Sequence, residues 1–306
     1  MPVLSVPSGV VTPLVTPFRN DCVDDAQLRR LVERQIAAGV DGVIVCDQMG
    51  EGLVLTANER RTVVSCAIST AAGRIPVVAA AGTNGTAQTI DIIAAVPEGI
   101  SALLVTVPYY SRPTAKGIVH HFRQIAEATP LPIIIDDDPQ RTARALTSEM
   151  LQELSCMPTI LGVRHCSGDL AAFMTMSAAL KRRYTHYAGD DPTAPAYLQA
   201  GASSVSSPIA NVFPELVRSC HDAARAHRGV AENAMRGRLC RAMGALGRIE
   251  PPALKQALSL LTGCGRDVRL PLVPLDEDEA RAIEAFLERH HFLRSDDCAE
   301  GLRKFL

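Results

Sequence analysis

Lysine is scarce in this sequence, which has four in 306 residues: Lys116, Lys181, Lys255 and Lys304. The lysine amine is the side-chain group that forms a Schiff base with a carbonyl substrate. Few residues are therefore available for imine chemistry. Lys116, Lys181 and Lys255 fall in segments with helix-like patterns and Lys304 lies at the terminus, so none falls on a predicted strand.

The sequence also lacks an excess of either charge, because 31 lysines and arginines face 33 aspartates and glutamates. No basic stripe dominates, which argues against a nucleic-acid partner. No uncharged apolar run approaches the roughly 20 residues that a membrane span needs. The first residues lack the basic and apolar parts of a signal peptide. We therefore expect a cytoplasmic protein with no membrane partner.

Paired cysteines are missing as well. The nine cysteines are scattered singly, and none forms a Cys-x-x-Cys pair or a zinc-ligand spacing. An odd and unclustered set suits reduced thiols in a cytosol. From this pattern we expect no disulfide framework. Separately, we expect no cofactor.

Hydrophobic residues make up 47% of the chain, and they recur as strand-like runs that alternate with amphipathic helix-like stretches. This alternation is the pattern of parallel β/α units. Eight units predict a (β/α)8 barrel over residues 1–225, and residues 226–306 predict a C-terminal helical extension. The eight predicted strands are Gly9–Thr16, Gly42–Cys46, Pro76–Ala81, Ala102–Val107, Pro132–Asp136, Ile160–Cys166, Tyr184–Ala188 and Ala202–Ser207.

Several helix-like stretches are preceded by residues that cap helices. Asp24 or Asp25, Thr56, Thr86 and Thr147 have side-chain oxygens that can accept from the first backbone N–H groups of a helix. The predicted helices include Asp25–Ala38, Asn58–Ala72, Lys116–Ala128, Ser148–Leu154, Ala231–Leu246, Pro252–Leu261 and Glu277–His290.

Short motifs in a fixed order are spread over the whole chain. They are Gly9 to Phe18, Gly50-Glu51, Gly82-Thr83-Asn84, Pro108-Tyr109-Tyr110-Ser111-Arg112-Pro113, Pro139-Gln140-Arg141-Thr142, Ser167-Gly168-Asp169, Gly189-Asp190-Asp191 and Arg269 to Pro274. Together they resemble the dihydrodipicolinate synthase / N-acetylneuraminate lyase family of aldolases. The resemblance implies a (β/α)8 barrel, a lyase that acts on 2-keto acids, and a homotetramer in which the Tyr109-Tyr110 pair crosses a dimer interface.

The positions that carry the chemistry of that family differ here. In the family, a strand that reads roughly G-I-K-E-A-T/S-G-D supplies the lysine that forms an imine with pyruvate, and Arg164 stands at that lysine. A guanidinium stays protonated and is not a Schiff-base nucleophile. We therefore expect the pyruvate-imine activity to be absent. By the same resemblance, two threonines become Gln48 and Met49, the glycine before them becomes Asp47, and a general acid/base tyrosine becomes Asp136.

Other positions keep the residue that the family has. Tyr110 in the family reaches into the site of the neighbouring subunit, Arg141 holds the carboxylate of an incoming substrate, and Gly189 lines the pocket. Two positions of the family's feedback site, often histidine, are Ala57 and Arg60. Inhibition by lysine is therefore not expected.

Strand alternation predicts that Arg164 and Asp136 both point into the barrel, from neighbouring strands. Burial of either charge alone would cost several kcal/mol, so an ion pair is expected at the C-terminal mouth. One interpretation is that the pair fills an inactive pocket. The other is that Arg164 anchors a substrate carboxylate or phosphate, which suits guanidinium geometry.

The run Asp136-Asp137-Asp138, with Asp47 and Glu51, offers oxygen ligands for Mg²⁺ or Mn²⁺. Alternation turns Asp137 away from its neighbours, however, so a solvated acidic loop with an arginine partner is the preferred interpretation. His165 is expected to pack behind its strand. Cys46 and Cys166, at strand ends near the mouth, are expected to be buried and inert.

Three functions remain open. The chain could be a divergent enzyme that handles a 2-keto or hydroxy acid through acid/base action of Asp136 or Tyr110, a non-catalytic member that binds a small carboxylate or keto acid, or a metal-assisted aldolase or hydratase. The expected substrate-binding residues are Arg164, Arg141, Gln48, Met49, Gly189 and Ser206.

Overall fold

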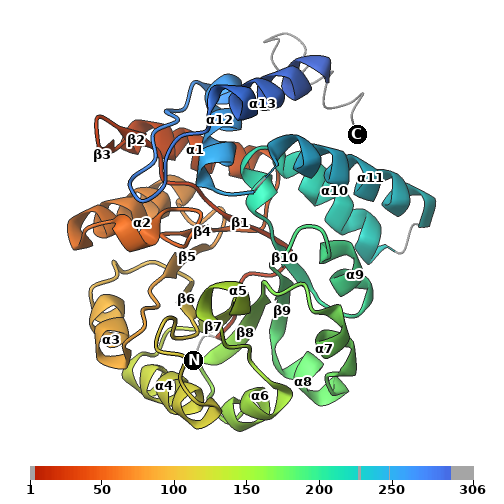
Figure 1. Cartoon of the computed structure of the whole chain (residues 1–306). Helices are drawn as coiled ribbons and strands as arrows, with labels where there is room; N and C mark the ends of the chain where they lie inside the picture. The colour runs from red at the N-terminus through yellow and green to blue at the C-terminus, as the bar shows by residue number, and fades with distance from the viewer. Residues whose placement is uncertain (1–3, 227–228, 248, 291–306) are drawn as a thin grey trace.

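The computed structural model describes residues 4–226, 229–247 and 249–290. Eight parallel strands form a closed barrel in the order β1-β10-β9-β8-β7-β6-β5-β4, with helices around it (Figure 1). The strands are β1 (Val10–Pro13), β4 (Gly42–Val45), β5 (Val77–Ala80), β6 (Ala102–Thr106), β7 (Ile133–Asp137), β8 (Ile160–His165), β9 (Thr185–Ala188) and β10 (Ser204–Ser206); a separate hairpin pairs β2 (Phe18–Arg19) with β3 (Cys22–Val23).

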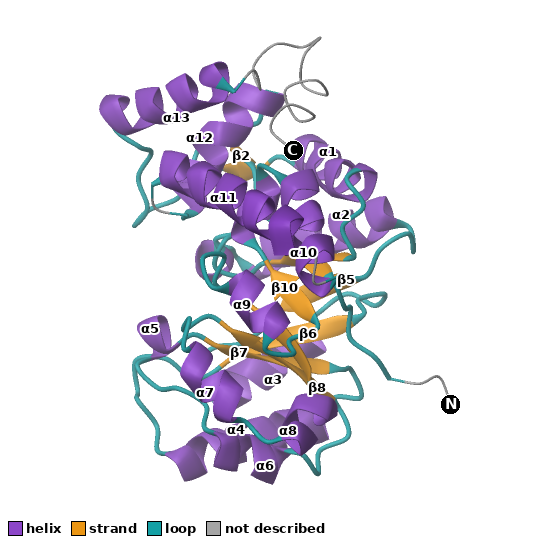
Figure 2. Ribbon diagram, turned by 90° about the vertical axis from the view of Figure 1, so that its right-hand side faces the viewer, coloured by secondary structure: helices purple, strands orange, loops and turns teal. Residues whose placement is uncertain are grey.

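Helices follow the strands and cover the outside of the barrel. Beside the barrel, α11 packs against α10 and α13, and α13 packs against α12 (Figure 2). The helices are α1 (Asp25–Ala37), α2 (Ala57–Ala71), α3 (Thr86–Ala94), α4 (Ala115–Ala128), α5 (Pro139–Thr142), α6 (Ser148–Leu154), α7 (Leu170–Thr175), α8 (Ala178–Arg183), α9 (Ala194–Gln199), α10 (Pro214–Arg225), α11 (Gly229–Leu246), α12 (Pro251–Thr262) and α13 (Glu277–Arg289), with 3-10 turns η1 (Gly52–Val54) and η2 (Pro208–Asn211).

The predicted (β/α)8 barrel is confirmed, and each predicted strand overlaps an observed one. The predicted and observed bounds differ most at the first strand. The prediction extends to Thr16, whereas the observed strand ends at Pro13. Leu14 still donates its N–H to the carbonyl of Ile44, after which the buried chain leaves the sheet. The proposed division of the chain near residue 225 stays a proposal.

The predicted helix caps are confirmed at Asp24, Thr56 and Thr147, whose side chains accept from the first turns of α1, α2 and α6. The prediction for Thr86 is wrong, because Gly85 is the N-cap and Thr86 is the first helical residue. The Thr86 hydroxyl instead lies 2.9 Å from Nδ1 of His121 on α4, where it ties α3 to its neighbour.

The barrel interior is a packed core below a polar mouth. Side chains from seven residues form one buried apolar cluster, including Ile134 and Leu104. In the register of the sheet, Thr106 stands beside Asp136, and Asp136 beside Arg164. Parallel strands share one direction, so these polar residues gather at the C-terminal ends of the strands, which is where sites lie in such barrels.

Among the helices that the structure describes, none is both long enough and apolar enough to cross a membrane.

Candidate active site

Arg164 is the centre of the mouth of the barrel. Its Nε donates to Oδ1 of Asp136 at 2.7 Å, and its Nη2 donates to Oδ2 at 2.9 Å. This is a two-pronged guanidinium–carboxylate pair, the stronger class of charged hydrogen bond. The predicted ion pair is therefore confirmed, and it follows from two inward positions on adjacent strands.

Asp47 is a second carboxylate partner of Arg164. Nη1 of Arg164 lies 2.9 Å from Oδ2 of Asp47 and 3.4 Å from Oγ of Ser206. Burial raises the pKa of Asp47, while the adjacent guanidinium opposes this shift. Our sequence reasoning noted Asp47 as a replaced glycine and an oxygen ligand, but missed this pairing. The charges of the replaced residues could have revealed it. Arg164, Asp47 and Asp136 all stand where the family has uncharged residues or a lysine, so two additional aspartates were available to one buried arginine.

Asp47 also orders the loop that follows β4. Its Oδ1 accepts from the backbone N–H groups of Met49 and Gly50, at 3.0 and 3.2 Å. Two non-glycine residues with positive φ flank this loop, Cys46 at 61° and Glu51 at 53°. Backbone strain of this kind clusters at binding and active sites, where the surrounding structure holds it.

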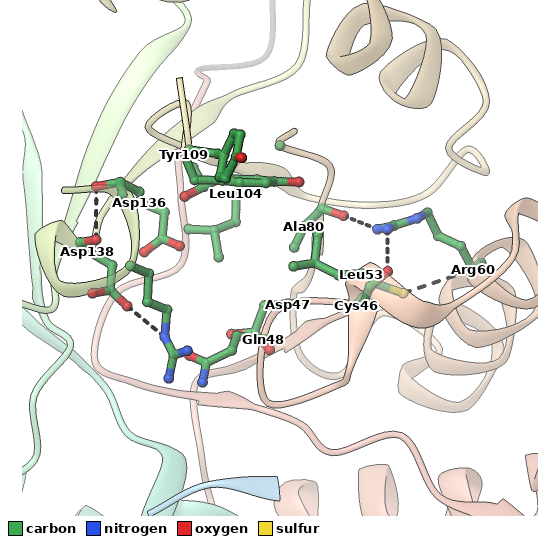
Figure 3. A pocket seen from close by; sticks show the side chains of 16 residues that line it. Cys46, Asp47, Gln48, Leu53, Arg60, Ala80, Leu104, Tyr109, Asp136 and Asp138 are labelled. Carbon is green, nitrogen blue, oxygen red and sulfur yellow. Dashed lines mark hydrogen bonds and ion pairs between the residues drawn. The ribbon is translucent and has the colours of Figure 1, made fainter. Parts of the chain in front are cut away.

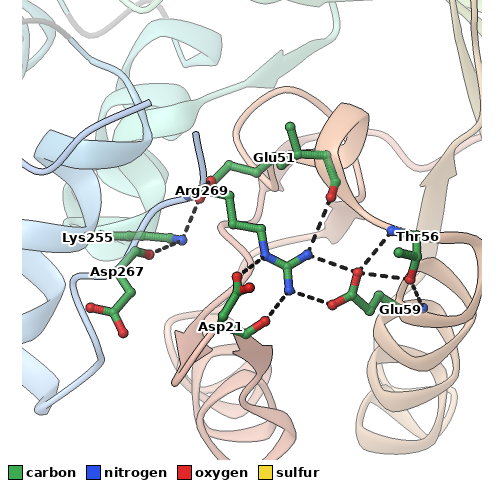
Figure 4. A network of polar contacts seen from close by, with 8 residues as sticks. Asp21, Glu51, Thr56, Glu59, Lys255, Asp267 and Arg269 are labelled. Atoms are coloured by element: carbon green, nitrogen blue, oxygen red, sulfur yellow. Dashed lines mark hydrogen bonds and ion pairs between the residues drawn. The ribbon is translucent and has the colours of Figure 1, made fainter. Parts of the chain in front are cut away.

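Residues of α12 and of the segment that follows it hold the same loop from outside the barrel (Figure 4). Nζ of Lys255, a fully buried residue on α12, lies 2.5 Å from Oε1 of Glu51. The backbone N–H of Arg269 donates to the other oxygen of Glu51 at 2.8 Å, and its guanidinium pairs with Glu59 on α2. Residues of the tail thus fix the position of the β4 loop.

Two adjoining cavities open at the mouth, of about 320 and 490 Å³. Figure 3 shows the smaller one. Asp47, Gln48, Asp138 and Arg141 line both of them. The smaller cavity has a largely apolar wall that includes Ala80, Leu53, Leu104, Tyr109 and Tyr110. The larger cavity is more polar, and its wall includes Met49, Arg164, Cys166, Gly189, Asp190, Asp191 and Ser206.

The structure brings most of the predicted ligand-binding residues to this mouth. Gln48 is half-buried, and Met49 and Ser206 are buried. Gly189 lies so close to Arg164 that a Cβ would be 2.9 Å from its Cγ, so only glycine fits there. Tyr110 belongs to the outer wall, where its side chain is 90% exposed.

Arg141, on α5, is half-exposed and pairs with Asp138, whose Oδ2 lies 3.2 Å from its Nε. Burial raises the pKa of Asp138, and the nearby Asp136 adds to the shift. Among the side chains that the structure describes, Arg141 is the ion-pair partner of this carboxylate. The sequence identified Asp138 only as part of the acidic run. Its pairing with Arg141 was missed, because that contact depends on the turn of α5.

Asp137 and His165 face away from the barrel interior, as alternation predicts. Asp137 accepts the N–H of Leu146 at 3.0 Å, and burial raises its pKa to about 7. His165 shares a 2.9 Å hydrogen bond with His186, and burial lowers the pKa of His165 to about 3. Within the described part of the chain, no three histidine, cysteine or acidic side chains are grouped as a metal site would require.

The two thiols near the mouth differ in exposure. Cys46 is buried, and burial raises its pKa to about 12. Cys166 is half-buried in the wall of the larger cavity, and burial also raises its pKa well above the usual value. Neither environment favours the reactive thiolate.

Comparison with known proteins gives matches over nearly the whole chain. Residues 6–290 match the model of the dihydrodipicolinate synthetase family. The 4-hydroxy-tetrahydrodipicolinate synthase of Hyphomonas neptunium is 37% identical over 288 residues, which cover 90% of this chain and 96% of the relative. The enzyme of the same name from Phenylobacterium zucineum is 38% identical and covers 88% of this chain and 92% of its own length.

A solved structure agrees with these sequence matches. The dihydrodipicolinate synthase of Acinetobacter baumannii, crystallised with pyruvate, superposes with a TM-score of 0.89 at 29% identity, over 94% of this chain and all of the other. The shared barrel places the strand ends of both proteins at corresponding mouths. With a family model that spans the chain and relatives above one-third identity, this protein belongs to the dihydrodipicolinate synthetase family of lyases.

Proposed function

We propose that this protein binds a small polar ligand at the mouth of the barrel and does not form an imine with pyruvate. The observation that carries the proposal is the guanidinium of Arg164, at the position that resembles the family's Schiff-base lysine. Four of its five N–H donors are used by Asp136, Asp47 and Ser206. A group that is permanently charged and held in this way is not a nucleophile.

Among the residues that the structure describes, no lysine is placed for imine chemistry at the mouth of the barrel. Lys255 is buried against Glu51. Lys181 donates to two backbone carbonyls, and Lys116 is exposed on α4. None of these three lines either cavity of the mouth. Lys304 lies outside the described residues.

The contacts at the mouth also favour binding over acid/base catalysis. Both oxygens of Asp136 accept hydrogen bonds from Arg164, which directs this carboxylate at the guanidinium rather than at a substrate. The side chain of Tyr110 is 90% exposed in the single chain. The strained loop after β4, kept in place by Asp47 and Glu51, supports a site that retains a ligand.

Borohydride reduction in the presence of pyruvate tests the proposal. Reduction makes an imine permanent, so an imine-forming protein gains the mass of the reduced adduct. We expect the intact mass of this protein to remain unchanged in mass spectrometry. The Hyphomonas neptunium relative, treated in parallel, serves as the positive control. A pyruvate adduct on any lysine of this chain would overturn the proposal.

We further propose a homo-oligomer, with a tetramer of tight dimers as the expected form. Tyr110 and Leu53 support this, since they are 90% and 70% exposed and lie beside the same cavity. Exposed apolar groups that gather at one place mark association surfaces.

Insensitivity to inhibition by lysine stays part of the proposal, because the guanidinium of Arg60 is bonded to the carbonyls of Ala80 and Gly52.

A further inference from the structure

The charges around the two cavities favour a cationic ligand over an anionic one. Arg164 is shared by two carboxylates, those of Asp136 and Asp47, so this group alone carries a net negative charge. Arg141 is paired with Asp138 at 3.2 Å and also faces Glu250 at 3.9 Å, so this group carries no net positive charge. An anion that enters therefore meets two guanidiniums whose charges are already balanced by carboxylates.

The remaining charged groups of the walls do not reverse this balance. Asp190 and Asp191 line the larger cavity, and the described residues provide no ion pair for either. Arg60 lines the smaller cavity, where its two Nη atoms donate to backbone carbonyls at 2.7 Å. The walls therefore hold five carboxyl groups and three guanidiniums, counting Asp47, Asp136, Asp138, Asp190, Asp191, Arg60, Arg141 and Arg164.

The smaller cavity provides a place for an apolar group beside these charges. Leu104 closes it from inside the barrel, and Tyr109 and Leu53 form its outer wall (Figure 3). Gln48 lies where the two cavities adjoin, and its side-chain amide has no hydrogen-bond partner among the described residues. Asp138 lines the same junction and keeps one carboxylate oxygen without a side-chain donor. An apolar pocket with a few convergent polar groups is the usual form of a small-molecule site.

We propose that the mouth binds a small organic amine, with its apolar part against Leu104 and Tyr109 and its ammonium group at Asp138 and the amide oxygen of Gln48. The inference deepens the proposed function and rests on it, because an imine-forming site must admit a keto acid. It replaces the expectation of a small-carboxylate ligand. The excess of carboxylates over guanidiniums then attracts the cationic ligand. When its ammonium group leaves water, it donates hydrogen bonds to acceptors of the site instead.

Three probes with one skeleton test the charge preference on the unaltered protein: 2-phenylethylamine, 2-phenylethanol and 3-phenylpropanoate. Calorimetry or ligand-observed NMR gives the three dissociation constants, with pyruvate as a fourth ligand. We expect the amine to bind roughly tenfold more tightly than the alcohol, as a hydrogen bond to a charged group provides. The propanoate and pyruvate should bind more weakly than the alcohol. Tighter binding of either carboxylate, or no binding of the amine at millimolar concentration, overturns the inference.

An Asp138→Asn variant tests the position of the ammonium group. It should lose most of the preference for the amine while its affinity for the alcohol stays the same. Asp91→Asn, which removes the same charge from an exposed position on α3, is the matched control and should keep the preference. If Asp138→Asn keeps it too, the assignment is wrong. If the variant does not fold, the probe comparison on the unaltered protein still decides. Failure of the proposed function is seen separately, as a pyruvate adduct after borohydride.

Discussion

Arg164 and Asp47 are joined across the full width of the barrel. Nη1 of Arg164 lies 2.9 Å from Oδ2 of Asp47, although three strands separate β8 from β4 on either side. Asp136, on the strand next to Arg164, holds the other edge of the same guanidinium. The three side chains form one charged unit that ties opposite walls of the mouth together.

Removal of Arg164 should destabilise the protein more than removal of either aspartate. Arg164→Met leaves two buried carboxylates unpaired and should cost about 3–5 kcal/mol, the range found for broken buried pairs. Asp136→Asn and Asp47→Asn should each cost less, because Arg164 keeps one carboxylate. Urea unfolding of the three variants gives the order. Arg281→Met, at an exposed ion pair, is the control and should change little.

Replacement of only Arg164 and Asp136 by apolar residues should not repair the site, because Asp47 then remains buried without its cation. Arg164→Met with Asp136→Leu and Asp47→Asn should be more stable than Arg164→Met alone. If the triple variant is the least stable of the set, the three residues do not act as one unit.

Arg164→Lys alone should not create an imine-forming enzyme. The carboxylates of Asp136 and Asp47 would surround the new amine and keep it protonated, whereas attack on a carbonyl needs the neutral amine. Borohydride with pyruvate should therefore leave the mass of this variant unchanged. A variant that also carries Asp136→Tyr and Asp47→Gly lacks both carboxylates and should trap more pyruvate. Equal trapping by the two variants would contradict this explanation.

Asp137→Asn should stabilise the protein increasingly as the pH rises. Burial raises the pKa of Asp137 to about 7, whereas an unfolded aspartate ionises near 4. Between these values the unfolded state releases the proton and the folded state keeps it, so the free energy of unfolding falls by about 1.4 kcal/mol per pH unit. Asparagine cannot ionise, and its side-chain oxygen can still accept the N–H of Leu146. Urea unfolding at pH 5 and pH 7 should show a difference that grows with pH, and a constant difference would refute the assignment.

Lys255→Met should loosen the β4 loop as well as destabilise the fold. It leaves the buried carboxylate of Glu51 with the backbone N–H of Arg269 and without its cation. Hydrogen exchange at the amides of Met49 and Gly50 should become faster. Addition of Glu51→Gln should restore part of the stability, and Lys116→Met, at an exposed position on α4, should leave the exchange unchanged. Unchanged exchange in Lys255→Met would show that the tail does not position the loop.

Light scattering at micromolar concentration should show an oligomer, with four copies as the expected number. Tyr110→Glu with Leu53→Glu places charges on the exposed apolar surface and should reduce the mass to that of a smaller species. Glu98→Gln, a polar change at an exposed position, should have no effect. An unaltered protein that is monomeric would exclude the proposed assembly.

The sequence by itself determined the barrel and one of the two ion pairs of Arg164, the pair with Asp136. Short apolar runs such as Pro132–Asp136 indicate buried parallel strands, and the period of two along a strand dictates that Asp136 and Arg164 point inward. Neighbouring strands of a β/α barrel also follow each other in sequence, so this contact could be predicted from order alone.

Only the tertiary structure decided the partners that lie in loops and in the tail. Asp47 stands 117 residues from Arg164, and Glu51 stands 204 residues from Lys255. No period links such positions, and the positive φ angles of Cys46 and Glu51 are imposed by the surrounding contacts rather than by local preference. The direction of a side chain in a loop of this kind is set by the charges packed around it, which exist only once the barrel has closed.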